Sequence, residues 1–284
     1  MAVTRVRSLG AGALAVLIAA VLGLLPAGTA PWRTALERFV AGIVLLADGD
    51  SAVPDGLGWI MGGTGNPLPD DIYLGLIENS YLNSQFPGYS FGGLSTPEQF
   101  CPVVCLPPLD GPLHLPPSLT PPPDSLLPFP RDLTFGSSVA TGAGILNNAI
   151  REPLQAGHDV AVFGYSQSAT VATVVMQDLI NNPPAGVDPS QLHFVLVGNP
   201  NDPLSGILTR FRFPDGIQAF NPFASAPQHL PFLNVPLGIG ATPTDVFPTD
   251  MYSIAYDGWA NFPQDPTNLL ADLNAIIGIL TVHG

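Results

Sequence analysis

The stretch VFGYSQSAT, residues 162–170, joins an apolar run to a helix-compatible run through a single serine, Ser166. The apolar run begins at residue 158 and is nearly continuous, as in a buried parallel strand. A strand joined so closely to a helix needs small residues in the turn, and Gly164 and Ser168 stand two positions on either side of the serine. We therefore expect a sharp turn that presents Ser166 at the carboxyl edge of a sheet.

Strand-like and helix-like segments alternate outward from this turn. Apolar runs predict strands and helical spacing predicts helices: strands within 56–63, 158–164, 192–200 and 250–258, and helices within 138–157, 167–184 and 266–283. Buried strands alternating with helices are typical of an α/β fold with a mostly parallel sheet. Two loop insertions interrupt this pattern. They are a Pro-rich segment at 86–130, either a disordered insert or an ordered lid, and a predicted lid at 207–240.

The turn matches the nucleophile elbow of serine hydrolases. Gly-x-Ser-x-Gly between a strand and a helix is that elbow, and Ser168 replaces the second glycine here. The helix N-terminus beside Ser166 favours negative charge that develops during acyl transfer. The alternative is an ordinary tight turn in which Ser166 caps the helix. A nucleophilic serine needs a base and an acid that orients the base.

Five histidines are candidates for the base. In elbow hydrolases the order along the chain is Ser, then Asp or Glu, then His. His283 follows every predicted strand and ends the last predicted helix, so we expect it to be the base, with His229 in a loop as the alternative. His114 precedes the serine. His158 and His193 begin strands and therefore lie at the opposite edge of the sheet.

The acid is expected at the carboxyl end of a strand. Asp257 meets this condition if the strand in 250–258 ends at Tyr256, since Gly258 then permits a sharp departure. Asp202, which follows the strand in 192–200, is the rival. We expect Asp257 to orient the histidine.

The oxyanion formed during acyl transfer needs two backbone donors. One is expected to be the amide of Gln167, directly after the nucleophile. The other is expected from the Gly-rich segment GGTGNPLP, residues 62–69, with Thr64 preferred and Gly63 or Gly65 as alternatives. A phosphate-binding loop is disfavoured, because the Gly-Lys-Ser/Thr ending is missing and the chain has no lysine.

Composition excludes several classes of function. The formal net charge is −14, and the eight basic residues are all arginines without a cluster of useful size. Nucleic-acid binding is therefore not expected. No His/Cys grouping has the spacing of a metal site, and neither a metal nor another cofactor is expected. No obligate protein partner is evident.

The N-terminus has the features of an export segment. Arg5 and Arg7 precede the apolar run Leu9–Leu25, and small residues follow it. We expect residues 1–30 to be either a cleaved signal peptide or a retained membrane anchor. A helical lead-in at 31–55 would then connect to a domain at 56–284. The protein would be exported, to the cell envelope or the medium.

Two cysteines, Cys101 and Cys105, fit an exported chain. Only one intramolecular pairing is open to them, and we expect it to staple the Pro-rich loop. Two cysteines alone make a poor zinc site.

The predicted lid is rich in phenylalanine. Such side chains need burial, either against the sheet edge or along a groove that binds an acyl chain. The candidates for an acyl groove are Phe211, Phe213, Phe220 and Phe223.

Several motifs occur in a characteristic order: MGGTGNPLP, VFGYSQSAT, FVLVGNPNDPLSGILTRF, GATPTD, YDGWANFP and NLLADLNAIIGILTVH. Together they resemble the PE-PPE domain of mycobacteria and related actinobacteria, a relative of the cutinase-like serine hydrolases. The resemblance covers roughly residues 55–284. It implies an α/β-hydrolase fold and a Ser–Asp–His triad, which falls on Ser166, Asp257 and His283.

The chain departs from that family pattern in two ways. The second aspartate of the YDGxADFP motif is Asn261 here. An apolar export segment stands where the family carries a PE or PPE module, as in stand-alone members that transfer acyl chains onto trehalose glycolipids. Three functions follow as expectations: an esterase or lipase acting on lipid or glycolipid esters, an acyltransferase with a sugar acceptor, or a non-catalytic module that binds the cell envelope.

Overall fold

The computed structural model describes residues 55–101, 129–130, 132–210, 235, 239–265 and 267–283. They belong to one compact unit of the chain. The predicted export segment lies outside the described residues, as do the four phenylalanines named as candidates for an acyl groove. No helix in the described ranges is both long and apolar enough to cross a membrane.

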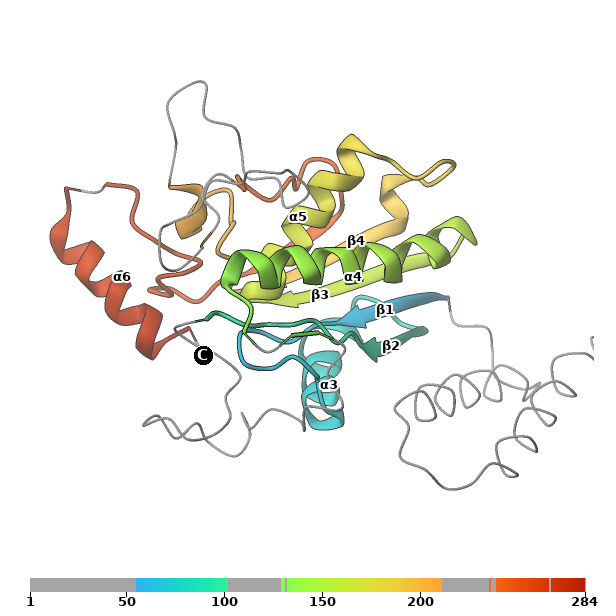
Figure 1. The fold of residues 1–284 in the computed structure, drawn as a ribbon, viewed down its shortest axis with the longest axis horizontal. Coiled ribbons are helices and arrows are strands. Elements are labelled where there is room, and N and C mark those ends of the chain that lie inside the picture. The colour runs from blue at the N-terminus through green and yellow to red at the C-terminus, as the bar shows by residue number, and fades with distance from the viewer. Residues whose placement is uncertain are drawn as a thin grey trace, which may run out of the picture. The chain divides into compact units, whose positions relative to one another are not determined.

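A five-stranded sheet forms the centre of this unit, with strand order β2-β1-β3-β4-β5 (Figure 1). Every neighbouring pair is parallel. The strands are β1 Gly56–Ile60, β2 Tyr89–Gly93, β3 Asp159–Tyr165, β4 Leu192–Val197 and β5 Thr249–Tyr252. The predicted α/β class with a parallel central sheet is confirmed.

Helices cover both faces of the sheet (Figure 1). On one face lie the long helices α4, Phe135–Gln155, and α5, Gln167–Asn181. On the other lie α3, Asp71–Ile77, and the short π-helix η1, Glu78–Leu82. Two short 3-10 turns lie at Pro189–Gln191 and Ile207–Thr209.

A cluster of buried apolar side chains lies on each face of the sheet. The apolar run of β3 contributes to both clusters, because side chains alternate between the two faces along a strand. Val160 and Val162 pack with α4 and α5. Ala161 and Phe163 pack with α3 and η1. The central strand is thus buried on both faces, which explains why its sequence is almost continuously apolar.

Helix α5 is held firmly beneath the serine that precedes it. Its buried residues run without a gap from Gln167 to Met176. It contacts α4 on one side and the sheet on the other. A helix enclosed in this way gives its N-terminus a fixed position at the carboxyl edge of the sheet.

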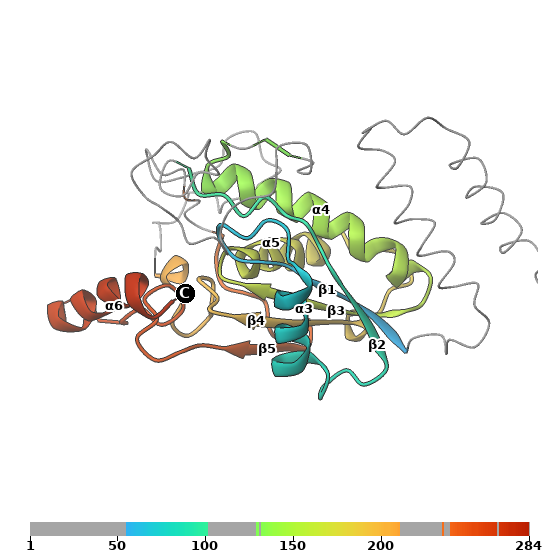
Figure 2. The same ribbon diagram turned by 90° about the horizontal axis from the view of Figure 1, so that it is seen from below.

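The last helix, α6, lies beyond the carboxyl ends of the strands (Figures 1 and 2). It covers Leu269–Thr281, and only Ala275 and Gly278 are buried. Six of its large apolar side chains are exposed: Leu269, Leu270, Leu273, Ile276, Ile277 and Leu280. The helix therefore contacts the body through Ala275, Gly278 and the partly buried Ile279.

Three differences from the sequence-based expectations concern the elements. Strand β2 lies inside the segment 86–130 that was predicted as an irregular insert, and α3 with η1 was not predicted. β2 is an edge strand that ends in two glycines, so its sequence signal is weak. Strand β5 ends at Tyr252, not at Tyr256, because its partner strand β4 ends opposite it at Val197. Tyr256 itself has a left-handed backbone with φ 71° and lies on the loop that follows.

Candidate active site

The turn at Ser166 has the geometry that the sequence predicted. Ser166 follows β3 directly, precedes α5 and has φ 57° and ψ −115°, an uncommon conformation for a residue with a side chain. Its amide donates to the Val197 carbonyl of β4 at 2.9 Å. A Cβ on Gly164 would lie 2.9 Å from the Ser168 carbonyl oxygen. The turn therefore excludes a side chain at Gly164.

Ser168 stabilises the same turn, which accounts for the missing second glycine. The Tyr165 amide donates to Ser168 Oγ at 2.8 Å, and this hydroxyl donates to the Tyr165 carbonyl at 3.0 Å. The side chain that replaces the glycine thus binds the backbone on the far side of the nucleophile.

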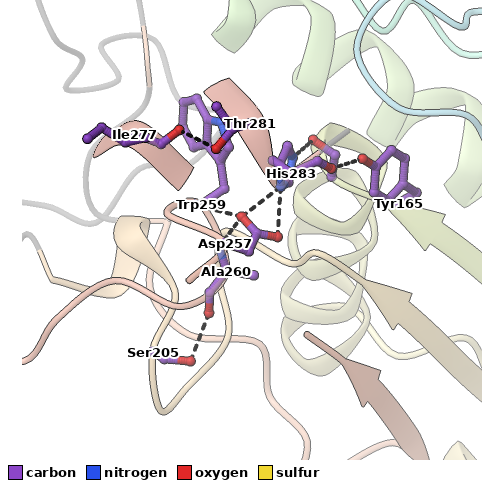
Figure 3. Close-up of polar contacts among 9 residues, drawn as sticks. Tyr165, Ser205, Asp257, Trp259, Ala260, Ile277, Thr281 and His283 are labelled. Carbon is purple, nitrogen blue, oxygen red and sulfur yellow. Dashed lines mark hydrogen bonds and ion pairs between the residues drawn. The ribbon is translucent and has the colours of Figure 1, made fainter. Parts of the chain in front are cut away.

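The three residues predicted as a triad form one hydrogen-bonded chain. His283 Nε2 lies 2.7 Å from Ser166 Oγ. His283 Nδ1 lies 2.8 Å from each carboxylate oxygen of Asp257 (Figure 3). A ring that donates from Nδ1 to the carboxylate leaves Nε2 as an acceptor for the serine proton. This arrangement can generate a nucleophilic alkoxide.

Asp257 is 2% exposed and lies on the loop after β5. The amides of Trp259 and Ala260 donate to its Oδ1 at 2.9 and 3.3 Å. Burial raises the pKa of the Asp257 carboxyl, but the hydrogen bond and charge of His283 and the two amides outweigh burial, so the net pKa is lowered. The carboxylate therefore stays ionised and can hold the imidazole in one orientation.

Two glycines let α6 bring His283 to Asp257. A Cβ on Gly278 would overlap the Tyr256 carbonyl oxygen, and a Cβ on Gly258 would overlap the Ala275 carbonyl oxygen. The backbone of α6 thus touches the backbone of the Asp257 turn at both positions.

Tyr165 and Gly198 complete the surroundings of the imidazole. The Tyr165 ring stacks on His283 with centroids 5.6 Å apart, and its hydroxyl donates to the His283 carbonyl (Figure 3). Burial, followed by the Asp257 charge, raises the pKa of Tyr165 to about 12, so the hydroxyl keeps its proton. Gly198 has φ 59°, and a Cβ there would lie 3.2 Å from His283 Cε1. Sequence reasoning identified neither residue.

The predicted oxyanion donors lie beside Ser166. Gln167 and Thr64 line one cavity with the serine, and Gln167 Nε2 donates to Thr64 Oγ1 at 3.3 Å. The backbone amides of Gln167 and Thr64 have no hydrogen-bond acceptor among the described residues. The amide of Gly65, an alternative donor in the sequence analysis, is not free to bind an oxyanion, because it donates to the Glu98 carbonyl at 2.8 Å.

A small apolar cavity of about 200 Å³ adjoins the nucleophile. Its apolar walls are Phe100, Phe135, Pro200, Trp259 and Ile279. Three of them, Pro200, Trp259 and Ile279, lie in the motifs quoted above, but nothing in the sequence indicated that these distant residues meet around one cavity. The acyl groove predicted at Phe211 to Phe223 lies outside the described residues.

A family model described as the PE-PPE domain matches residues 87–284. The chain belongs to the PE-PPE domain family. The predicted resemblance is therefore confirmed.

The PE-PPE chain has relatives in Mycobacterium tuberculosis with differing names. One is named esterase PE16, 40% identical over 79% of this chain and 35% of that protein. Another is named diacyltrehalose acyltransferase Chp2, 31% identical over 54% of this chain and 39% of that protein. This chain spans about a third of the length of the first relatives that it matches.

Among solved structures, this PE-PPE chain is similar to a cutinase-like protein from Cryptococcus sp., with a TM-score of 0.40 and 18% identity. The match covers 81% of this chain and 92% of that one. The acetyl xylan esterase core domain from Trichoderma reesei gives the same TM-score at 13% identity, over 81% of this chain and 97% of that one.

The rival acid and one other histidine have partners elsewhere in this PE-PPE domain. Asp202 caps a turn, because its Oδ1 accepts from the Leu204 amide at 2.7 Å. His193 Nε2 lies 2.7 Å from Asp250 Oδ2. The alternative base His229 lies outside the described residues. Asn261, which departs from the family pattern, is exposed.

Cys101 is disulfide-bonded. Its predicted partner, Cys105, lies outside the described residues. Within the described ranges, no three His, Cys, Asp or Glu side chains gather where they could hold a metal ion.

Proposed function

We propose that this chain is an exported serine esterase that hydrolyses fatty-acyl esters, with Ser166 as nucleophile, His283 as general base and Asp257 as the orienting acid. The observation that carries this proposal is the continuous hydrogen-bonded chain from Ser166 Oγ through the imidazole to the buried carboxylate. At its serine end, this chain lies beside the backbone amides of Gln167 and Thr64, which have no hydrogen-bond acceptor among the described residues.

The proposed reaction follows from these positions. Ser166 Oγ attacks the ester carbonyl as its proton passes to His283 Nε2. The oxyanion accepts hydrogen bonds from the amides of Gln167 and Thr64. Collapse breaks the ester bond, and His283 returns the proton to the leaving alcohol. Water then attacks the acyl-enzyme by the same steps and releases the acid and free Ser166.

The apolar cavity beside Ser166 supports an acyl substrate. Each methylene buried there contributes about 0.8 kcal/mol at most, which is roughly fourfold in rate. We expect kcat/KM for p-nitrophenyl esters to rise over several carbons from acetyl and then level off, because 200 Å³ holds a limited length of chain. Initial rates across an acyl series measure this dependence.

Two controls accompany the acyl series. The Ser166→Ala protein supplies the blank for each ester, and a phosphate ester should be turned over poorly because no basic cluster is available for it. A rate that stays flat or falls beyond the acetyl ester would remove the acyl-binding role of the cavity.

Acyl transfer is a second candidate function. It is supported by the relatives that bear acyltransferase names, Chp2 and the SL1278 acyltransferase Chp1. Both reactions share the acyl-enzyme, and they differ in whether water or an alcohol attacks it. Mass analysis of products from a fatty ester, with and without trehalose, separates them: free acid in both samples supports hydrolysis, and an acylated sugar supports transfer.

A non-catalytic, envelope-binding module is the remaining alternative. An activated serine reacts covalently with a fluorophosphonate probe, whereas an inactive module does not. Labelling of the wild-type protein that Ser166→Ala abolishes would exclude this alternative.

Export is supported by the apolar N-terminal segment and by the disulfide at Cys101, since disulfides persist in oxidising compartments. Fractionation of the host cells, with intact mass measurement of the recovered protein, tests both the location and the fate of residues 1–30. Recovery in the cytoplasm with residues 1–30 intact would contradict export.

A further inference from the structure

A buried acidic residue belongs to a segment that contacts both residues assigned to the oxyanion by the proposed function. Glu98 is 1% exposed. Its backbone has φ 48°, in the left-handed region that residues with side chains rarely adopt. Glu98 takes no part in the acyl-transfer steps, and nothing in the sequence singled it out. A buried acid in a strained conformation at this place needs an explanation.

The segment that carries Glu98 contacts both oxyanion residues. The Glu98 carbonyl accepts from the amide of Gly65, which directly follows Thr64, at 2.8 Å. The next carbonyl, that of Gln99, accepts from Gln167 Nε2 at 3.0 Å. The segment therefore connects the loop of one donor to the side chain of the other, and its displacement would move both.

The carboxyl group of Glu98 has few polar neighbours. Its Oε1 accepts from Thr96 Oγ1 at 2.8 Å, while its buried Oε2 has no hydrogen-bond partner among the described residues. No basic side chain in the described ranges forms an ion pair with it. The Glu98 charge also acts on the Tyr73 hydroxyl of α3, whose pKa is raised first by burial and then by that charge.

These surroundings favour the uncharged acid. Burial raises the pKa of Glu98 to about 8, against the opposing effect of the Thr96 hydrogen bond. A protonated carboxyl can stay buried without a cation, whereas a carboxylate there has to find water or a partner. Ionisation of Glu98 therefore acts on the segment that connects the two oxyanion residues.

We propose that Glu98 is a positioning residue that holds the Thr64 loop and Gln167 in place as an uncharged acid, and that its ionisation displaces residues 96–99 and lowers kcat. This inference rests on the proposed esterase function. The substitution Glu98→Gln tests it directly, because a glutamine side chain keeps one donor and one acceptor but cannot ionise.

The first experiment measures kcat and KM for a soluble short-chain ester from about pH 6 to 10, with Ser166→Ala as the blank. We expect wild-type kcat to fall about tenfold by roughly one pH unit above the Glu98 pKa, where about a tenth of the molecules keep the proton. Glu98→Gln should match the wild-type kcat near neutral pH within about threefold and show no such fall. Glu152→Gln, an exposed glutamate on α4, should follow the wild type.

The second experiment needs no catalytic activity. The pKa of Glu98 is higher in the folded protein than its unperturbed 4.5, so between these values the folded state binds the proton more tightly. The free energy of unfolding contributed by this group therefore falls as pH rises from about 4.5 to 8, and is constant outside that window. Denaturant titrations should show this slope in the wild type and in Glu152→Gln, but not in Glu98→Gln.

The outcomes separate this inference from the proposed function. If no ester is hydrolysed above the blank, the esterase proposal fails, and the unfolding slope still reports on Glu98. If Glu98→Gln keeps the wild-type alkaline fall in kcat, the positioning role is wrong. If Glu98→Gln does not fold, the measurements on the wild-type protein test the proposal. A wild-type kcat that stays level through about pH 9.5 overturns it. A fall in kcat near pH 8, together with the pH dependence of the free energy of unfolding, supports it.

Discussion

Ser166→Ala should reduce kcat/KM for short and medium p-nitrophenyl esters by about 10⁴-fold or more, because the nucleophile of a triad has no substitute. The amides of Gln167 and Thr64 remain, so a small residual rate above water is compatible with the mechanism. Because the substitution removes one atom at a turn, the circular dichroism spectrum should be unchanged and the melting temperature nearly so. Steady-state kinetics on the purified variant measure the effect.

Ser190→Ala is the matched control for this experiment. Ser190 is exposed in the 3-10 turn that precedes β4, at the opposite edge of the sheet. It should retain wild-type kinetics. Activity of Ser166→Ala near that of the wild type would remove Ser166 from the reaction and leave its left-handed turn as a structural feature only.

His283→Ala should be nearly as damaging as loss of the serine, because it removes both the proton acceptor and the proton donor to the leaving alcohol. Asp257→Asn should cost less, about 10²- to 10⁴-fold in kcat, since the carboxylate orients the imidazole and does not transfer the proton. KM should change much less than kcat in both variants. The same ester assay measures both kcat and KM.

Controls for the two partners use residues of the same type outside the site. His158→Ala, at the amino end of β3, and Asp245→Asn, on an exposed loop, should behave like the wild type. His229→Ala is the critical comparison, because His229 was the alternative base. If His229→Ala abolishes hydrolysis while His283→Ala retains it, the geometry around His283 does not describe the reactive state.

Much of the fold was accessible from the sequence where local signals and packing agree. The apolar run into Gly164 and the helical spacing after Ser166 predicted β3, the turn and α5, because a central parallel strand is buried on both faces. The order of Ser, Asp and His along the chain led to the three side chains that meet in the structure. In the segment from β3 to α5 the sequence signal is local, and burial of the strand on both faces constrains which residues can stand there.

Other features depend on contacts between distant segments and had no local signal. Ile254 and Tyr256 favour a strand by composition, yet both are exposed on the loop that carries Asp257. Tyr165 gains its role from the His283 carbonyl, just beyond the end of α6, and Glu98 from an amide 33 residues earlier in the chain. Patterns along a chain do not report such pairings, because they arise only when the sheet is assembled.

The contact between Gly258 and Gly278 affects how intact sites can be recognised in genome sequences. At each position an added Cβ would overlap a main-chain oxygen, so no change in a neighbouring side chain can compensate for it. A chain could keep the serine, aspartate and histidine and still fail to bring the histidine to the aspartate. Loss of either of these glycines, which are 20 positions apart in the chain, is therefore expected to keep the histidine from the aspartate even where all three site residues are retained.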